Sequence, residues 1–296
     1  MSIGAIIKQE KMNPTVIDLE FFENWAVKEG LYYGEPGDAW EWQDYSGGED
    51  IREHLLIVCD HNGFGRGVSL LVYEDYSVEL TMNVPPAPWD IDLFYRLIGS
   101  FCDELGQSVF FHEGEECTVE QLDALKAETT AYMQRYVKNN LTAGYTVFGC
   151  IYPIVIEQEL VDSIQNVSEE EAHRMYGEYL HAKQELDCGY VSTMLFRNQM
   201  DDSLVARYIV SKAVDMIFPL QKEVPFGCTK EMEEQIVHWS VDLGDYNEEG
   251  QMTIFFQCPF DQFCSIVDIE KYPRFDARHV IIRLDNEMVQ EIMEKM

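Results

Sequence analysis

Two Glu-x-x-His patterns give this sequence its clearest candidate metal ligands, Glu170, His173, Glu178 and His181. Residues three positions apart lie on one face of a helix, so each glutamate and its histidine could bind the same ion. Di-iron bundles, however, take such motifs from different helices and add further carboxylates. Both patterns here fall on one predicted helix, about two turns apart. The alternative is a solvated helix face without metal, and we expect no cofactor.

A thiol, a carboxylate and an imidazole are adjacent at Cys59, Asp60 and His61. Cysteine catalysis requires a base that reaches the sulfur in space. Cys59 and His61 share one face of a predicted strand, but their side chains extend from it in parallel. The segment therefore indicates either a composite Cys/His/carboxylate active site completed by distant residues or a buried cysteine at a strand end.

The glycines that follow resemble a phosphate-binding loop, with the sequence NGFGRG at residues 62–67. A dinucleotide-binding fingerprint needs a helix directly after the loop, because the N-terminus of that helix faces the phosphate. The sequence predicts a strand there instead, and the lysine of a P-loop is missing. The pattern therefore favours a hairpin turn over a nucleotide site.

Aromatic and acidic residues alternate in a predicted irregular loop at residues 31–50, which we call the aromatic-acidic segment. Aromatic side chains form interface anchors, and carboxylates steer a cationic partner to a surface. Twelve acidic residues lie between Asp18 and Asp60, against two basic ones. The alternative is that the aromatic rings cover an edge of the core. The candidate partner-binding residues are Tyr32, Tyr33, Trp40, Glu41, Trp42, Asp44 and Tyr45.

The acidity of the chain is spread over its whole length. There are 54 acidic and 21 basic residues, a formal net charge of −33. Residues 1–148 carry 26 acidic and 9 basic residues (net −17), and residues 149–296 carry 28 and 12 (net −16). An evenly acidic surface repels nucleic acid and anionic membranes and attracts a basic partner. We therefore expect a non-enzymatic protein-binding module, immunity-like or regulatory. The alternatives are an enzyme with a composite or metal site and an inhibitor that mimics DNA.

The composition is that of a globular protein, with 46% hydrophobic and 12% aromatic residues. The N-terminal apolar stretch, Ile3 to Ile7, is too short for a signal-peptide core. The longest apolar segment elsewhere, residues 145–156, has about half the length that spans a bilayer. Eight cysteines without a C-x-x-C pattern indicate reduced thiols. We expect a cytoplasmic protein that starts at Met1 or at Met12.

Helices and strands are predicted in a mixed order, without a regular alternation of strand and helix. Apolar spacing and capping residues predict helices at 16–28, 90–105, 118–138, 168–185 and 286–296. Strands are predicted at 54–60, 68–80, 108–112, 145–156, 190–196, 205–218, 238–243, 251–258 and 279–284, although residues 204–217 could equally be helical. This order favours an α+β fold with mostly antiparallel sheets. Its two subdomains would be residues 1–140 and 141–296, unless the chain forms one continuous domain.

The sequence GRGVSLLVYEDYSVELTMNVPPAPWDIDLFYRLIGSFCDEL, residues 65–105, resembles a bacterial family of about 300 residues named domain of unknown function 4299. The shared features are a G-x-G strand, an alternating strand, a proline-containing break, Trp89-Asp90 and an apolar helix. A looser likeness covers Leu204 to Pro225. The resemblance implies a cytosolic bacterial protein and carries no catalytic residues to this chain.

Overall fold

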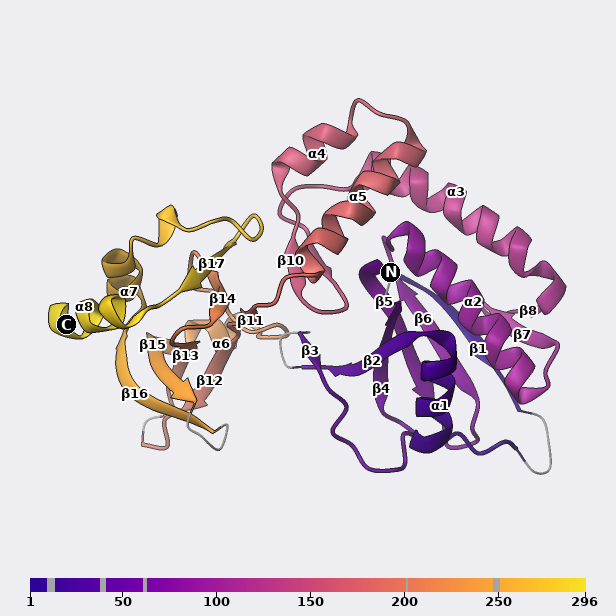
Figure 1. Ribbon diagram of the computed structural model, residues 1–296, viewed down its shortest axis with the longest axis horizontal. Helices are drawn as coiled ribbons and strands as arrows, with labels where there is room; N and C mark the ends of the chain where they lie inside the picture. The colour runs from indigo at the N-terminus through magenta and orange to yellow at the C-terminus, as the bar shows by residue number, and fades with distance from the viewer. Residues whose placement is uncertain (10–13, 38–40, 61–62, 201, 247–250) are drawn as a thin grey trace. The chain divides into compact units, whose positions relative to one another are not determined.

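The computed structural model describes the chain except for residues 10–13, 38–40, 61–62, 201 and 247–250. The chain divides into two compact units, Met1–Glu185 and Leu186–Met296. Figure 1 shows helices packed against a sheet in each unit. Most strand pairs are antiparallel, and helices and strands are mixed along the chain, so the fold is α+β as predicted.

An eight-stranded sheet forms the first unit, with the strand order β3-β2-β4-β5-β6-β1-β7-β8. Each neighbouring pair of strands in it is antiparallel. The strands are β1 (Ser2–Ile7), β2 (Leu31–Pro36), β3 (Trp42–Gln43), β4 (Leu55–Asp60), β5 (Gly63–Val72), β6 (Val78–Asn83), β7 (Val109–His112) and β8 (Glu115–Thr118). The middle strands carry the apolar residues of the core.

The helices of the first unit pack against this sheet and against one another (Figure 1). They are α1 (Leu19–Glu29), α2 (Pro88–Leu105), α3 (Leu122–Asn140), α4 (Gln158–Ile164) and α5 (Glu169–Gln184), with a 3-10 turn at Val119–Gln121 before α3. A small hairpin, β9 (Thr146–Phe148) and β10 (Pro153–Val155), precedes α4. Helix α2 contacts β1, β4, β5 and β6, and helix α5 contacts α3 and β5.

Helix α2 shows why the sequence folds in this way. Its predicted apolar face, which includes Ile91, Phe94, Ile98 and Phe101, is fully buried in the core. Apolar residues at spacings of three and four form one stripe that packs on the sheet. Gly106 ends the helix with a φ of 62°, a left-handed conformation that glycine adopts without a steric penalty.

The second unit combines a four-stranded sheet, β12-β13-β15-β16, with a three-stranded sheet, β11-β14-β17. Phe218, Phe260 and Phe263 lie at the centre of its core. Two of its pairs, β13–β15 and β11–β14, are parallel. Its elements are β11 (Gly189–Tyr190), β12 (Thr193–Arg197), β13 (Leu204–Ser211), β14 (Asp215–Pro219), α6 (Lys230–Glu234), β15 (Ile236–Tyr246), β16 (Met252–Pro259), α7 (Phe260–Val267), β17 (His279–Arg283) and α8 (Asn286–Lys295), with a 3-10 turn at Ile269–Lys271.

Several expectations about the elements differ from the structure. The segment 31–50, predicted as an irregular loop, contains β2 and β3, and the predicted strand 205–218 is the two strands β13 and β14. The predicted strand 68–80 is the end of β5 and the start of β6, joined by a turn in which Tyr76 has a φ of 61°. The predicted strand 145–156 is the hairpin β9–β10. The compact first unit extends to Glu185, past the expected division after residue 140, because α3 packs against α5.

A search of the described helices for one long and apolar enough to cross a membrane finds none.

Candidate functional site

The side chains of the predicted metal ligands on α5 point to separate partners. His173 is buried, and its Nε2 lies 2.9 Å from the carbonyl oxygen of Pro86. Burial lowers the pKa of His173, so the neutral ring donates a hydrogen bond to that carbonyl. His181 accepts a hydrogen bond from the Phe64 backbone N–H at Nδ1 (3.1 Å). Its Nε2 faces Glu185 at 3.2 Å.

The two glutamates of the same motifs lie on the surface. Glu178 accepts a hydrogen bond from the Arg174 guanidinium, and Glu170 is exposed. Within the described part of the chain, no three His, Cys, Asp or Glu side chains are grouped closely enough to hold a metal ion. In this structure the two histidines bind the β5 strand and the Pro86 segment to α5.

The candidate catalytic triplet is only partly described, because His61 lies outside the described residues. Cys59 is buried in β4 and packs with Ile57 and Cys150 in a small apolar cluster. The Asp60 carboxylate pairs with the Arg96 guanidinium at 2.6 Å. In the described residues, Cys59 therefore lies in an apolar setting, as expected of a structural thiol.

The glycines of the segment 62–67 lie in strand β5, where they allow close contact with the start of α2. A Cβ atom on Gly65 would be 2.4 Å from Oδ2 of Asp90, and one on Gly63 would be 2.9 Å from the Trp89 ring. Asp90 is buried and accepts backbone hydrogen bonds from Arg66, Gly67 and Ala87 at 2.7–3.0 Å. The anion held at this glycine-rich segment is thus the chain's own carboxylate.

Burial of Asp90 has a cost that its hydrogen bonds only partly offset. Burial disfavours the charged form, and backbone N–H donors and Arg66 favour it. The net effect raises the pKa of Asp90 to about 6.

Most of the described aromatic residues predicted to bind a partner are partly buried. Tyr33 packs edge-to-face on Phe22, and Tyr45 packs against the main core. Trp42 packs against the cluster of Ile57, Cys59 and Cys150. Tyr32 is the exception, with 45% of its surface exposed.

Tyr32 is the outer end of a row of rings that extends across β2, β5 and α5. Its ring stacks on Phe64 with 6.0 Å between centroids, and Phe64 lies 6.0 Å from His181. Trp89 then meets His181 edge-on at 5.8 Å. We call Tyr32, Phe64, His181 and Trp89 the aromatic row. Its inner members fix the position of the exposed ring of Tyr32.

The acidic members of the aromatic-acidic segment are at least partly accessible. Asp44 is exposed and Glu41 is half-buried, and Glu49 and Asp50 are also exposed. Trp40 lies outside the described residues. The exposed carboxylates and Tyr32 are thus the parts of this segment that solvent or another protein can reach.

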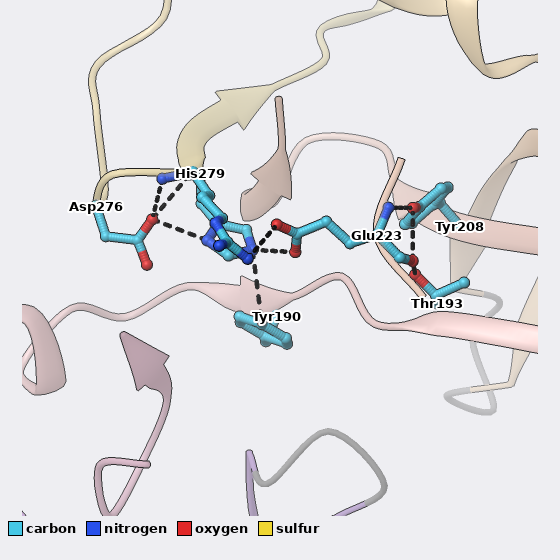
Figure 2. Close-up of polar contacts among 7 residues, drawn as sticks. Tyr190, Thr193, Tyr208, Glu223, Asp276 and His279 are labelled. Atoms are coloured by element: carbon cyan, nitrogen blue, oxygen red, sulfur yellow. Dashed lines mark hydrogen bonds and ion pairs between the residues drawn. The ribbon is translucent and has the colours of Figure 1, made fainter. Parts of the chain in front are cut away.

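A second cluster, in the second unit, was not predicted from the sequence (Figure 2). The buried His279 begins strand β17, and its two ring nitrogens face carboxylates on opposite sides. Nδ1 lies 2.8 Å from Oδ1 of Asp276, and Nε2 lies 3.2 Å from Oε2 of Glu223. The Tyr190 hydroxyl lies 3.4 Å from Nε2. Asp276, His279 and Glu223 form what we call the histidine clamp.

The two carboxylates of the histidine clamp keep its imidazole charged. Burial favours the neutral ring, but the hydrogen bonds and charges of Asp276 and Glu223 outweigh it and raise the pKa of His279 to about 9. A ring that is protonated at neutral pH holds no lone pair for proton abstraction. The geometry therefore suits an ion-pair bridge better than a general base.

Glu223 is held by both its backbone and its side chain. The Glu223 backbone N–H donates to the Tyr208 hydroxyl at 2.7 Å. Its carbonyl accepts hydrogen bonds from Thr193 at 2.6 Å and from Tyr208 at 3.1 Å. Figure 2 shows Glu223 between His279 and these two hydroxyls. This arrangement fixes the segment after β14 to strands β12, β13 and β17.

Only part of this cluster could be predicted from the sequence. Asp276 and His279 stand three residues apart, and in the structure Oδ1 of Asp276 also accepts the backbone N–H groups of Arg278 and His279 at 2.8 Å. Glu223 is far away in the sequence and reaches the ring only through the pairing of β14 with β17. A local pattern could have suggested the pair, but not the second carboxylate.

The basic residues of the chain are mostly engaged by its own carboxylates. Others contact carbonyls or rings: Lys138 donates to the carbonyls of Ile164, Gln165 and Val167, and Lys8 lies over the Phe111 ring. The residues in ion pairs include Lys28, Arg52, Arg96, Lys126, Arg174, Lys183, Arg197, Arg207, Lys212, Lys222, Arg274, Arg278, Arg283 and Lys295. With 54 acidic residues against 21 basic ones, most of the excess negative charge remains without an internal partner.

Comparison with known proteins gives one match. No curated protein and no solved structure matches the chain. The family model described as a domain of unknown function, DUF4299, matches residues 2–292, which is nearly the whole sequence. The chain therefore belongs to the domain of unknown function 4299 family.

Proposed function

We propose that this protein is a non-enzymatic binding module, regulatory or immunity-like, that takes a basic protein as its partner. The observation that supports this most is the imbalance of charge described above: most of the described cations already have partners within the chain, and 54 acidic residues outnumber the 21 basic ones. Such a surface attracts a cationic protein at long range and repels nucleic acid and anionic lipid.

The aromatic-acidic segment is the proposed first contact. Tyr32 offers an exposed ring whose position is fixed by stacking on Phe64. Ordered aromatic residues are good interface anchors, because little side-chain entropy is lost when they bind. Asp44 and Glu49 supply exposed charge in the same segment. The partly buried Tyr33, Trp42 and Tyr45 would support this surface from behind.

The proposal also places the protein in the bacterial cytoplasm. No disulfide joins any of the eight cysteines, all of which lie in the described part of the chain. Reduced thiols are typical of a reducing compartment. Mass spectrometry of thiols trapped in intact host cells would test the compartment, and a disulfide among these cysteines would contradict it.

Affinity capture from host lysate tests the function. We expect the immobilised protein to retain a basic protein at about 50 mM salt and to release it at about 500 mM, because salt screens exposed charges. The variant Tyr32→Ala should retain less of the same protein. Its matched control is Tyr132→Ala, since Tyr132 is a similarly exposed tyrosine on α3, outside the aromatic-acidic segment.

Two results would contradict the proposal. The first is that no basic protein is retained at low salt. The second is that whatever is retained stays bound regardless of salt, because the charge would then play no part in binding. Equal losses for Tyr32→Ala and Tyr132→Ala would reject Tyr32 as an anchor.

A further inference from the structure

A groove of about 300 Å³ is present on the first unit between α4 and α5. These two helices lie side by side in Figure 1 and contact each other. The apolar lining is provided by Leu160, Met175 and Tyr179. Three carboxylates, those of Glu157, Glu159 and Glu178, lie among the same lining residues. The lining of the groove is therefore both apolar and acidic.

The chain's own cations show which chemistry this lining accepts. The Lys183 ammonium lies 5.3 Å from the centre of the Tyr179 ring and 3.4 Å from Oε2 of Glu157. The Arg174 guanidinium donates to Glu178. The aromatic ring and two of the three carboxylates thus already contact positive charge, through cation–π and ion-pair contacts.

Glu159 differs from the other two glutamates of the groove. It is exposed, and its carboxylate makes no ion pair with the described residues. Glu157 and Glu178 are partly neutralised by Lys183 and Arg174. Glu159 therefore leaves one negative charge at the groove for a cation from outside the chain.

We propose that this groove receives an arginine side chain of the basic partner, an inference that rests on the proposed function. The methylene stem of arginine would pack on Leu160 and Met175, and its planar guanidinium would lie against Tyr179 and bind Glu159. Arginine suits such a site better than lysine, because its flat group stacks on rings and presents two donors to one carboxylate. The charge of the groove matches this occupant.

The test uses the full-length protein with methyl-13C-labelled methionine and a capped Gly-Arg-Gly peptide. The reporter is the Met175 methyl group, whose NMR signal should shift and saturate as the peptide is added. A peptide with citrulline in place of arginine keeps the shape but loses the charge, and it should leave the signal unchanged. Met133, fully buried on α3, serves as the internal control signal.

The variant Glu159→Gln should weaken arginine-peptide binding by about twofold to fivefold, as expected for one exposed charge contact. The matched variant Glu169→Gln, exposed at the start of α5 and outside the groove, should bind as the native protein does. The groove assignment fails if Met175 does not respond, if citrulline acts like arginine, or if Glu159→Gln binds unchanged.

The two proposals can fail separately. If capture of a basic protein from lysate succeeds and Glu159→Gln captures as much as the native protein, the partner proposal stands and the groove assignment falls. If no basic protein is captured, the partner proposal falls, and the peptide titration still decides whether the groove binds arginine.

Discussion

His279 and Asp90 are both buried titratable residues, and their partners differ in kind. His279 lies between two carboxylates, which stabilise its charge. Asp90 is held by backbone N–H groups, and burial still raises its pKa to about 6. Stability therefore depends on pH in both units, at different pH values.

The histidine clamp should stabilise the second unit most below pH 6.5. The folded-state pKa of His279, about 9, is higher than the usual 6.5, so its contribution is complete below 6.5 and is lost as the pH rises through 9. The full difference corresponds to about 3 kcal/mol of unfolding free energy. Urea unfolding of the native protein and of Glu223→Gln, from pH 6.5 to about pH 10, should show a shallower decline in the variant.

Glu270→Gln is the control for this experiment, because Glu270 forms an exposed ion pair with Arg274 in the same unit. The unfolding free energy of Glu270→Gln should fall with rising pH in parallel with that of the native protein. If the unfolding free energy of Glu223→Gln also falls in parallel, the clamp does not keep His279 charged.

Asp90→Asn should destabilise the first unit by about 2–3 kcal/mol, because a buried acceptor of three N–H groups becomes a group that must also satisfy two donors of its own. Asp92→Asn, a change of the same kind at an exposed position on α2, should cost less than about 1 kcal/mol. Thermal and urea unfolding measure both. Equal costs would mean that Asp90 does not hold β5 to α2.

Asp90 also gives the first unit a pH dependence of the opposite sign to that of a carboxyl whose pKa is lowered on folding. Its folded-state pKa is raised from 3.8 to about 6, so the folded state binds the proton more tightly. Its contribution is therefore largest below pH 3.8 and is lost as the pH rises through 6. Comparing the pH dependence of unfolding in the native protein and in Asp90→Asn isolates this effect.

At the level of elements, the glycines of β5 decide how closely this strand approaches the start of α2. Gly65→Ala would place a methyl group 2.4 Å from the Asp90 carboxylate, and we expect a loss of about 1–3 kcal/mol in unfolding free energy. Gly48→Ala is the matched control, because a Cβ atom there meets nothing within 4 Å. Urea unfolding should separate the two variants, and similar stabilities would show that the close contact can relax.

Elements with a strong local pattern could be predicted from the sequence. Helix α2 follows from apolar spacing with Gly106 after it, and α5 from the capping residue Ser168. The turn within residues 68–80 was missed because Tyr73 to Leu80 alternates as one strand would. In the structure, Glu74 and Asp75 form the turn between β5 and β6, and Tyr76 follows it with a φ of 61°.

The candidate sites were harder to predict because side chains take their partners from distant segments. His173 and His181 lie on one helix, as the sequence predicts. Their partners, Pro86 and Phe64, lie far away in the sequence. The same applies to Glu223 and His279, which the sheet brings together. Spacing along one helix describes a face, and it does not show what packs on that face.

For the molecule as a whole, the uncompensated charge is the main electrostatic cost of folding. Like charges brought together on a compact surface repel, and dissolved ions screen that repulsion. Raising NaCl from about 20 mM to about 500 mM should therefore raise the melting temperature. Each kcal/mol of relieved repulsion corresponds to about 2–4 °C. A melting temperature that stays constant or falls with salt would show that the −33 charge is not limiting stability.

The distribution of cysteines has a practical consequence. The first unit holds Cys59, Cys102, Cys117 and Cys150, all buried, whereas Cys188, Cys228 and Cys264 of the second unit are partly accessible. An alkylating reagent applied to the native protein should therefore mark the second unit alone. Modification of the four cysteines of the first unit would require that unit to open, and modification of the buried Cys258 would require the second unit to open. The identity of the alkylated peptides therefore shows which unit unfolds first.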